Sequence, residues 1–244
     1  MSARRTLATA GRVLAQVRHD PRTIGLLIVV PCVLIGLMAW VFSGTPTFDR
    51  YGALILALFP FIIMFIVTSV VMLRERQGGT LERLMTTPLG RGDLLAGYAL
   101  AFGALAIVQA VIATAFAVWV CGLDVAGDVW LLVVIAVLDA LLGVTLGLLG
   151  SAFASTELQA VQFMPAFVLP QLFLCGLFVE RDQLPRGLKQ LSDVLPLSYA
   201  IDAMRTVSTQ ADAASEVWGS LGVVTGFVIG AVLLAALTLR RRTT

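Results

Sequence analysis

The stretch RERQGGTLERLMTTPLGRGDL, residues 74–94, holds seven charged side chains in twenty-one residues. The neighbouring stretches, Tyr51–Leu73 and Leu94–Val120, contain no charged residue at all. A helix crosses the bilayer core with about 20 apolar residues, and each neighbour is long enough to do so. The pattern therefore predicts two membrane-spanning helices joined by a short, charged segment outside the bilayer.

The composition of the whole chain indicates a lipid environment. Of its 244 residues, 59% are apolar and 13% are charged, and the mean hydropathy is +0.94. Soluble globular domains carry about 25% charged residues and about 45–50% apolar ones. A formal net charge of +2 does not favour nucleic acid as a partner. Cys32, Cys121 and Cys175 lie far apart without metal-ligand spacing, so we expect buried thiols and no metal or other cofactor.

Six stretches are long and apolar enough to span a bilayer. We therefore expect an all-α polytopic membrane protein in which residues 1–244 form a single transmembrane domain. Pro165 and Pro170 interrupt the fifth stretch, which makes it the least regular of the six. The expected spans are Ile24–Phe42, Tyr51–Leu73, Leu94–Val120, Val129–Ala152, Val161–Phe178 and Val217–Leu239.

Arginine and lysine decide the expected orientation, because both are enriched in cytoplasmic segments of membrane proteins. With six spans, twelve of the seventeen positive residues fall on one side, in the N-terminal segment, in residues 74–93 and at the C-terminus. The other five are Arg50, Arg181, Arg186, Lys189 and Arg205. Both termini and the charged segment 74–93 are therefore expected in the cytoplasm.

The first 22 residues are too polar to span a bilayer, but they have an amphipathic pattern. The apolar residues that share one arc of a helical wheel are Leu7, Ala10, Val13, Leu14 and Val17. The polar residues on the opposite arc are Arg5, Arg12, Gln16 and His19. We expect an interface helix in the membrane plane, which Asp20-Pro21 ends before the first span. The alternative is a basic flank that only sets the topology.

Inside the charged segment, Gly78-Gly79 is expected to end one helix and Thr80 to cap a short new one, closed by Pro88 and Gly90. The apolar residues on one face of this helix would be Leu81, Leu84 and Met85. A helix of two turns is not stable alone in water, so it must pack against something else. The spacing leaves three candidates open: the membrane surface, the rest of the chain, or a cytoplasmic protein.

The expected outer loop, residues 179–216, holds two short amphipathic runs. After Pro185, the apolar residues at helical spacing are Leu188, Leu191 and Leu195. After Pro196, they are Leu197, Ile201, Met204 and Val207. Each run has about half the length that spans a bilayer, so we expect two short re-entrant helices at, or dipping into, the outer leaflet. A soluble extracellular cap is the alternative.

A single carboxylate, Asp139, falls within the expected spans. It lies ten residues into the fourth span, roughly 15 Å deep, and a charge at that depth cannot face lipid cheaply. Three glycines follow on nearly the same face in a close-packing pattern: Gly143, Gly147 and Gly150. We expect Asp139 inside the bundle, where it either hydrogen-bonds to Gln109 or Gln171 or gives a substrate route a polar contact.

Three stretches, in this order, carry a resemblance to a known family. The first is the amphipathic N-terminus running into HDPRTIGLLIVVPCVLIGLMAWVF. The second is RERQGGTLERLMTTPLGRGDLLAGY, with the core residues Gly79, Thr80, Glu82, Leu84, Thr87, Pro88 and Leu89. The third is LPRGLKQLSDVLPLSYAIDAMR, with Pro185, Leu191, Pro196, Leu197, Tyr199, Asp202 and Arg205. They resemble the interface helix and first span, the coupling loop, and the stretch before the last span in membrane subunits of ABC-2 type ABC exporters. The resemblance covers essentially the whole chain.

The resemblance implies a permease subunit in the inner (plasma) membrane of a bacterium, which moves an amphiphilic drug, lipid or glycan outward. It also implies two cytoplasmic ATPase subunits and a second membrane subunit, either a copy of this chain or a paralogue. The residues implied to contact the ATPase are Gly79, Thr80, Leu81, Glu82, Leu84 and Met85. The sequence contains no GxxxxGK[ST] motif, and no expected cytoplasmic loop is long enough for a nucleotide-binding domain. We therefore expect no enzymatic activity here and ATP hydrolysis on a separate chain.

Other classes of membrane protein fit the sequence less well. An intramembrane hydrolase needs a base beside its nucleophile, and the one histidine, His19, lies in the expected cytoplasmic helix. A secondary transporter or channel is the stronger alternative. Such proteins often show several midplane charges and internal repeats, and this chain shows neither clearly. That alternative also leaves the charged segment 74–93 unexplained.

Overall fold

The computed structural model describes residues 2–78 and 91–240, and every regular element within these ranges is helical. The elements in chain order are α1 (Ala3–Arg18), α2 (Pro21–Ile24), η1 (Gly25–Val29), α3 (Val30–Val41), α4 (Thr47–Gln77), α6 (Arg91–Ala115), η2 (Phe116–Val120), α7 (Val129–Ser151), α8 (Glu157–Leu174), η3 (Arg181–Gln183), α9 (Arg186–Asp193), α10 (Pro196–Thr209) and α11 (Ala214–Arg240). Of these, η1 and η2 are π-helical and η3 is a 3₁₀ turn.

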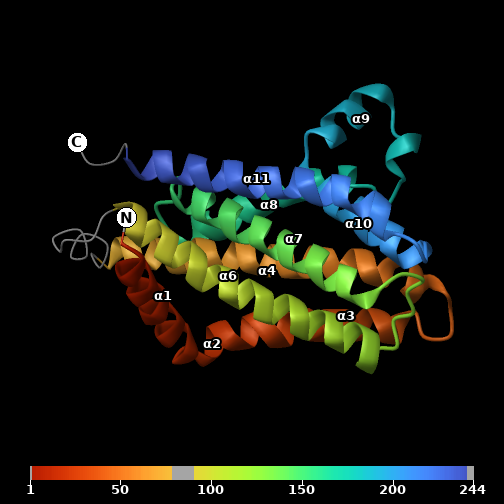
Figure 1. Ribbon diagram of the computed structural model, residues 1–244, viewed down its shortest axis with the longest axis horizontal. Coiled ribbons are helices and arrows are strands. Elements are labelled where there is room, and N and C mark those ends of the chain that lie inside the picture. Colours follow the sequence, from red (N-terminus) through yellow and green to blue (C-terminus); the bar gives the residue numbers. More distant parts are fainter. Residues whose placement is uncertain (1, 79–90, 241–244) are drawn as a thin grey trace.

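The long helices run side by side along one direction (Figure 1). The start of α1 and the end of α11 lie at one end of this bundle, and α9 and α10 lie at the other. Within the described ranges, five helical stretches are long and apolar enough to cross a membrane. They are Pro21–Val41, Thr47–Glu75, Gly92–Val120, Val129–Ser151 and Ala214–Leu237. The prediction of an all-α polytopic membrane protein is confirmed.

The expected fifth span, Val161–Phe178, corresponds to α8, and α8 is not among these five apolar stretches. Its 18 residues include Pro165 and Pro170 as well as several glutamines and a glutamate, which lower its apolar character. Two ion pairs nevertheless connect α8, together with the chain that follows it, to positions near both ends of α4. Arg74, near the end of α4, pairs with Glu157 at the start of α8. Arg50, near the start of α4, pairs with Glu180, just beyond α8. The sixth crossing stays a prediction that this placement supports.

The helix α4 is the centre of the bundle, and α7 packs most closely against it. A Cβ atom added to Gly143 would collide with the carbonyl oxygen of Phe61. One added to Gly147 would lie 2.6 Å from the carbonyl oxygen of Phe65. Only a residue without a side chain allows the two backbones to come this close, as in other small-xxx-small contacts between membrane helices. The prediction that this glycine face packs tightly is confirmed.

The break between the N-terminal helix and the first span is where the sequence predicts it. The Asp20 carboxylate accepts hydrogen bonds from the backbone N–H groups of Arg22 and Thr23 and from the Thr23 hydroxyl. These bonds satisfy the first donors of α2, which Pro21 begins. The hydrogen bond from Thr23 holds the pKa of Asp20 below its usual value. The carboxylate therefore keeps its charge, and its capping role, at neutral pH.

Two expectations about surface helices need correction. The apolar arc of α1 was expected on the membrane, but Ala10, Val13 and Val17 are buried against the bundle, while Leu7 is 64% exposed. The apolar stripe of α10 was expected in the outer leaflet, but Ile201 and its neighbours pack on α4, α7 and α11. In both cases helical spacing identifies an apolar face without identifying what covers it. The leucines of α9 remain exposed, so its contact with the leaflet stays a prediction.

Candidate functional site

At the end of the bundle where α1 begins, α1 is fixed to the first turns of α6 (Figure 1). The backbone N–H of Ser2 donates to Asp93 Oδ1 at 2.8 Å, and Asp93 is buried. A Cβ atom at Gly97 would lie 2.6 Å from the Cβ of Thr9, so glycine is needed for this approach. The N-terminal helix is thus a packed part of the bundle at the point where the described chain resumes after the charged segment.

Arg12 joins α1 to α4 as well as to α6. Its Nη1 and Nη2 atoms lie 3.3 Å and 3.4 Å from the two carboxylate oxygens of Glu75, and Nη2 donates to the Tyr98 hydroxyl at 2.5 Å. The side chain of Glu75 is only 4% exposed. Loss of Arg12 would leave the buried Glu75 carboxylate without its charged partner, whereas Arg12 itself keeps some contact with solvent. We call the cluster of Arg12, Glu75 and Tyr98 the α1 clamp.

The residues expected to contact an ATPase, namely Gly79, Thr80, Leu81, Glu82, Leu84 and Met85, lie outside the described residues. The structure describes their flanks: α4 ends at Gln77 and α6 begins at Arg91. The α1 clamp holds Glu75, just before the first flank ends, and Tyr98, two turns into the second. Both ends of the charged segment are therefore tied to one N-terminal helix.

A second, more exposed tie links the end of α4 to the start of α8. Arg74 Nε and Nη2 donate to the two carboxylate oxygens of Glu157 at 2.7 Å and 3.0 Å. The side-chain amide of Gln77 donates to the carbonyl oxygen of Ser155 at 2.7 Å. Since Arg74 and Glu157 are about half exposed, water screens their attraction, and such pairs contribute about 0–1 kcal/mol. At the end of α4, the ion pair of Glu75 with α1 is therefore stronger than the ion pair of Arg74 with α8.

Asp139 is fully buried in the middle of α7, as the sequence predicts. Neither of its carboxylate oxygens has a hydrogen-bond partner among the described residues. Gln109 on α6 is also buried with both amide atoms unpaired. Gln171 on α8 donates to the carbonyl oxygen of Phe167 and accepts from the N–H of Leu197. The expected hydrogen bond from Asp139 to Gln109 or Gln171 is therefore not formed.

At the opposite end, the residues of the third family stretch hold the chain between α8 and α10 in place. Arg181 donates to Asp202 on α10 and to Asp193 on α9, and it lies over the ring of Tyr199 at 5.0 Å. The Tyr199 hydroxyl donates to the carbonyl oxygen of Asp193 at 2.8 Å. Burial raises the pKa of Asp202 above its usual value, although the hydrogen bond from Arg181 opposes that rise. These contacts give Tyr199 and Asp202 a structural role at this end.

Four further expected residues of this region are also placed. Arg205 donates to the carbonyl oxygen of Gly176 and lies 3.5 Å from Glu180. Gly176 has a φ of +90°, a conformation that side chains rarely adopt. Pro185 precedes α9 and Pro196 begins α10, so both start helices as predicted. Leu191 on α9 is 50% exposed and does not join the cluster.

The most important contacts that sequence reasoning missed are those of the α1 clamp. The helical wheel put Arg12 on the polar arc, away from the bundle, whereas it reaches 63 residues along the chain to Glu75. The available signal was a carboxylate at the start of the charged segment and a phenol just beyond its end, both close to the ends of two apolar stretches. Polar residues at these positions are expected to be buried and to require hydrogen-bond partners, but the sequence does not indicate which residues those partners are.

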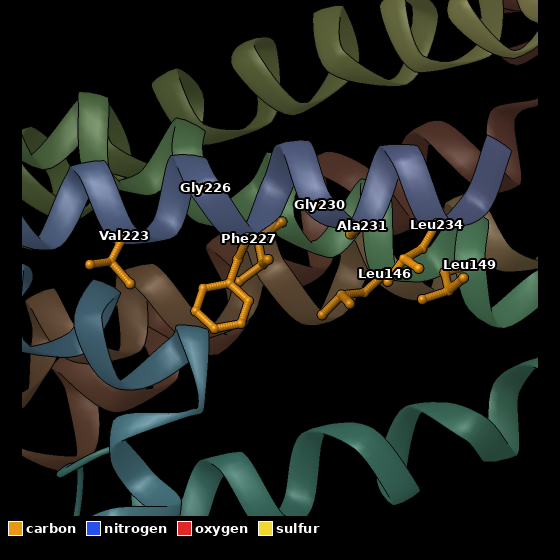
Figure 2. Close-up of a pocket in the computed structure, with 9 residues that line it drawn as sticks. Leu146, Leu149, Val223, Gly226, Phe227, Gly230, Ala231 and Leu234 are labelled. Atoms are coloured by element: carbon orange, nitrogen blue, oxygen red, sulfur yellow. The ribbon is translucent and has the colours of Figure 1, made fainter. Parts of the chain in front are cut away.

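An apolar groove runs between α7 and α11 (Figure 2). Its volume is about 430 Å³, and only apolar residues line it. Leucines come from α7, while α11 contributes two glycines at the groove's base, Gly226 and Gly230, flanked by Val223, Phe227 and Leu234. None of the polar residues expected at a functional site lies in this groove.

A model of the ABC-2 type transporter family matches residues 5–208. The chain belongs to the ABC-2 type transporter family. The match includes most of α1, the whole charged segment and nearly all of α10, so it covers almost all of the three resembling stretches.

Individual members of the family are similar over about two thirds of the chain. "Probable multidrug ABC transporter permease YbhR" of Escherichia coli (strain K12) is 30% identical over 167 residues, which is 68% of this chain and 45% of that protein. YbhS of the same organism, named in the same way, is 26% identical over 60% of this chain and 39% of its own length. "Linearmycin resistance permease protein LnrN" of Bacillus subtilis (strain 168) is 24% identical over 68% of this chain and 44% of its own length. The chain thus spans about half the length of the curated relatives it matches.

Proposed function

We propose that the chain is a membrane-spanning permease subunit of an ATP-binding cassette exporter, and that it moves an amphiphilic substrate such as a drug, lipid or glycan outward. ATP would be hydrolysed on a separate cytoplasmic subunit. Membership of the ABC-2 type transporter family supports the transport role. The names of YbhR, YbhS and LnrN support a drug-like substrate, because they refer to multidrug transport or antibiotic resistance.

The observation that carries the coupling part of the proposal is the α1 clamp. A partner that pushes on the segment 79–90 would move the end of α4 and the start of α6, the two flanks of that segment. Arg12 binds residues on both flanks, so α1 would move with them. The weaker contact between Arg74 and Glu157 would let α8 respond separately. The geometry therefore suits transmission of motion from a cytoplasmic partner into the bundle.

The proposed assembly has two ATPase subunits and two membrane subunits in an inner or plasma membrane. Both termini would lie in the cytoplasm. The start of α1, the end of α4, the start of α6 and the end of α11 share one end of the bundle, and the sequence places arginines at each of them. The second membrane subunit would be a copy of this chain or a paralogue. Two similar permeases, YbhR and YbhS, occur together in Escherichia coli, which supports the paralogue as a real option.

The test is the substitution Leu84→Asp in the charged segment, with the chain expressed beside its ATPase. If Leu81, Leu84 and Met85 enter a groove on the ATPase, the new carboxylate is buried without a partner, which costs several kcal/mol. That loss weakens a contact by orders of magnitude. We expect normal expression and membrane insertion, but little co-purification of the ATPase and little substrate-stimulated ATP hydrolysis.

The control is Arg91→Ala, at the first residue of α6, which should change both readouts far less. Intact co-purification and intact stimulated hydrolysis in Leu84→Asp would reject the docking role. The segment would then be a helix resting on the membrane, and the ATPase would dock on another part of the chain.

A further inference from the structure

The end of the bundle opposite α1 contains two adjacent cavities. The smaller one, of about 390 Å³, lies between the start of α4, the chain after α8 and the end of α10. The larger, of about 520 Å³, lies between that same chain, α9 and α10. Glu180 and Arg205 line both cavities and form the wall between them. The smaller cavity is lined by both charged and apolar side chains.

The charged rim of the smaller cavity has equal numbers of both signs. Two carboxylates, Asp49 and Glu180, face two guanidiniums, Arg50 and Arg205. A ligand that carries one sign of charge would leave the opposite pair without compensation. A ligand that carries both signs in one headgroup can contact all four residues and keep the site neutral.

Two of the four rim charges, Asp49 and Arg50, are incompletely satisfied by the protein itself. Arg50 is 70% exposed, and its one ion pair, with Glu180, spans 3.9 Å, too long for a good hydrogen bond. Asp49 accepts one hydrogen bond, from the N–H of Asp124 at 3.1 Å, and has no ion pair with any described residue. Exposed pairs of this kind contribute about 0–1 kcal/mol, so a ligand can replace them at small cost.

Below the rim, the cavity is apolar. Leu54 lies one turn deeper than Arg50 on α4, and Tyr51, Leu177 and Phe178 complete this floor. The Phe178 side chain is 61% exposed, although the ring of Phe173 lies 5.8 Å from its own ring. A ring in this position attracts an ammonium group or packs on an alkyl chain. The site is charged at the level where the α4 span begins and apolar one turn further in, as the headgroup and acyl layers of a membrane are.

We propose that this cavity binds a zwitterionic amphiphile, with its phosphate on Arg50 and Arg205, its ammonium on Asp49 and Glu180, and its alkyl chain on Leu54, Leu177 and Phe178. The ligand is either a phospholipid of the surrounding membrane or an exported molecule with the same chemistry. The idea that this site lies on an export route rests on the proposed function. The binding of a zwitterionic amphiphile to the cavity does not depend on it.

The test compares lipids that share the same acyl chains and differ only in headgroup charge. The purified chain is incubated with an equimolar mixture of phosphatidylethanolamine, phosphatidic acid and a diacyl trimethylammonium lipid, and the retained lipids are counted by native mass spectrometry. We expect the zwitterionic lipid to exceed each singly charged one by about fivefold or more, as about 1 kcal/mol of preference gives. Asp49→Asn and Arg50→Gln should each remove most of that preference.

The matched control is Asp212→Asn, an exposed carboxylate beyond the end of α10 that does not line the cavity. It should leave the preference unchanged. Equal retention of all three lipids, or a preference that survives both Asp49→Asn and Arg50→Gln, would overturn the proposal. None of these measurements uses an ATPase, so their failure leaves the export proposal standing.

A second arm, with the ATPase bound, separates the two sources of the ligand. Loss of the retained zwitterion during ATP turnover assigns the site to an exported molecule, and retention throughout assigns it to a resident membrane lipid.

Discussion

Two helices of this bundle carry glycines at similar helical spacing, and the two glycine faces have different surroundings. The glycines at helical spacing are Gly143, Gly147 and Gly150 on α7, and Gly222, Gly226 and Gly230 on α11. On α7, side chains at the first two positions would strike the backbone of α4. On α11, a Cβ at any of the three would meet no atom within 4 Å. The small-xxx-small pattern therefore indicates that another helix can approach the backbone closely. Whether a helix of this chain does approach it depends on the rest of the sequence.

The difference follows from what each helix has opposite it. The partner of α7 is α4, which runs through the centre of the bundle and presents Phe61 and Phe65 with their carbonyl groups toward the glycines. The corresponding face of α11 opens onto the apolar groove beside α7 (Figure 2). One glycine face is thus part of the core, and the other is part of the surface that the chain shows to its surroundings.

The largest effect is expected from Gly143→Leu. The new side chain collides with the Phe61 carbonyl, so α7 and α4 must separate and lose the tightest contact of the bundle. Overpacking of this kind costs about 1–3 kcal/mol and occasionally more. The measurement is thermal unfolding of the purified chain, followed by tryptophan fluorescence, together with the yield of monodisperse protein. A melting temperature equal to the wild type would show that α4 does not pack here.

An intermediate effect, of opposite sign, is expected from Asp139→Asn. Asp139 lies one turn before Gly143 on α7, and neither of its oxygens is hydrogen-bonded in the described structure. Asparagine keeps the shape and removes the carboxylate, whose burial without a partner is costly. We expect the melting temperature to rise by about 2–4 °C, the shift that about 1 kcal/mol produces in a chain of this size. A fall would mean that the carboxylate has a partner in the protein as purified.

The smallest effect is expected from Gly226→Leu. The side chain enters the groove between α7 and α11, where nothing obstructs it. Surface substitutions of this kind usually change stability by less than about 0.5 kcal/mol. The melting temperature of Gly226→Leu should stay within about 2 °C of the wild type, whereas that of Gly143→Leu should fall much further. A comparable fall in both variants would remove the distinction between the two glycine faces.

The sequence predicts most of the helices because their physical cause is local. Long runs without charge define α4, α6 and α7, Asp20-Pro21 defines the break before the first span, and Asp139 must be buried because lipid does not accept its charge. The contacts between helices were predicted less well. Arg12 was placed on a solvent-facing arc and binds Glu75, while Ile201 was placed in the leaflet and is buried in the bundle.

These errors have one physical origin. A period of 3.6 residues says that a helix has an apolar side and a polar side. It does not say whether lipid, water or another helix lies on either side, because all the candidates satisfy the same pattern. The roles proposed for Leu84 and the other residues of the charged segment stay predictions for the same reason.

The α1 clamp has a consequence for how the protein is made. The ribosome completes Arg12 long before it has synthesised Glu75, 63 residues later, and Tyr98, 86 residues later. During that interval, Ala10, Val13 and Val17 have no surface of their own chain on which to pack. An amphipathic helix in that position adsorbs to the membrane surface, which is the location that its sequence alone predicts. We therefore expect the N-terminal helix to begin as a membrane-bound segment during translation and to dock on the bundle only after α6 has been inserted.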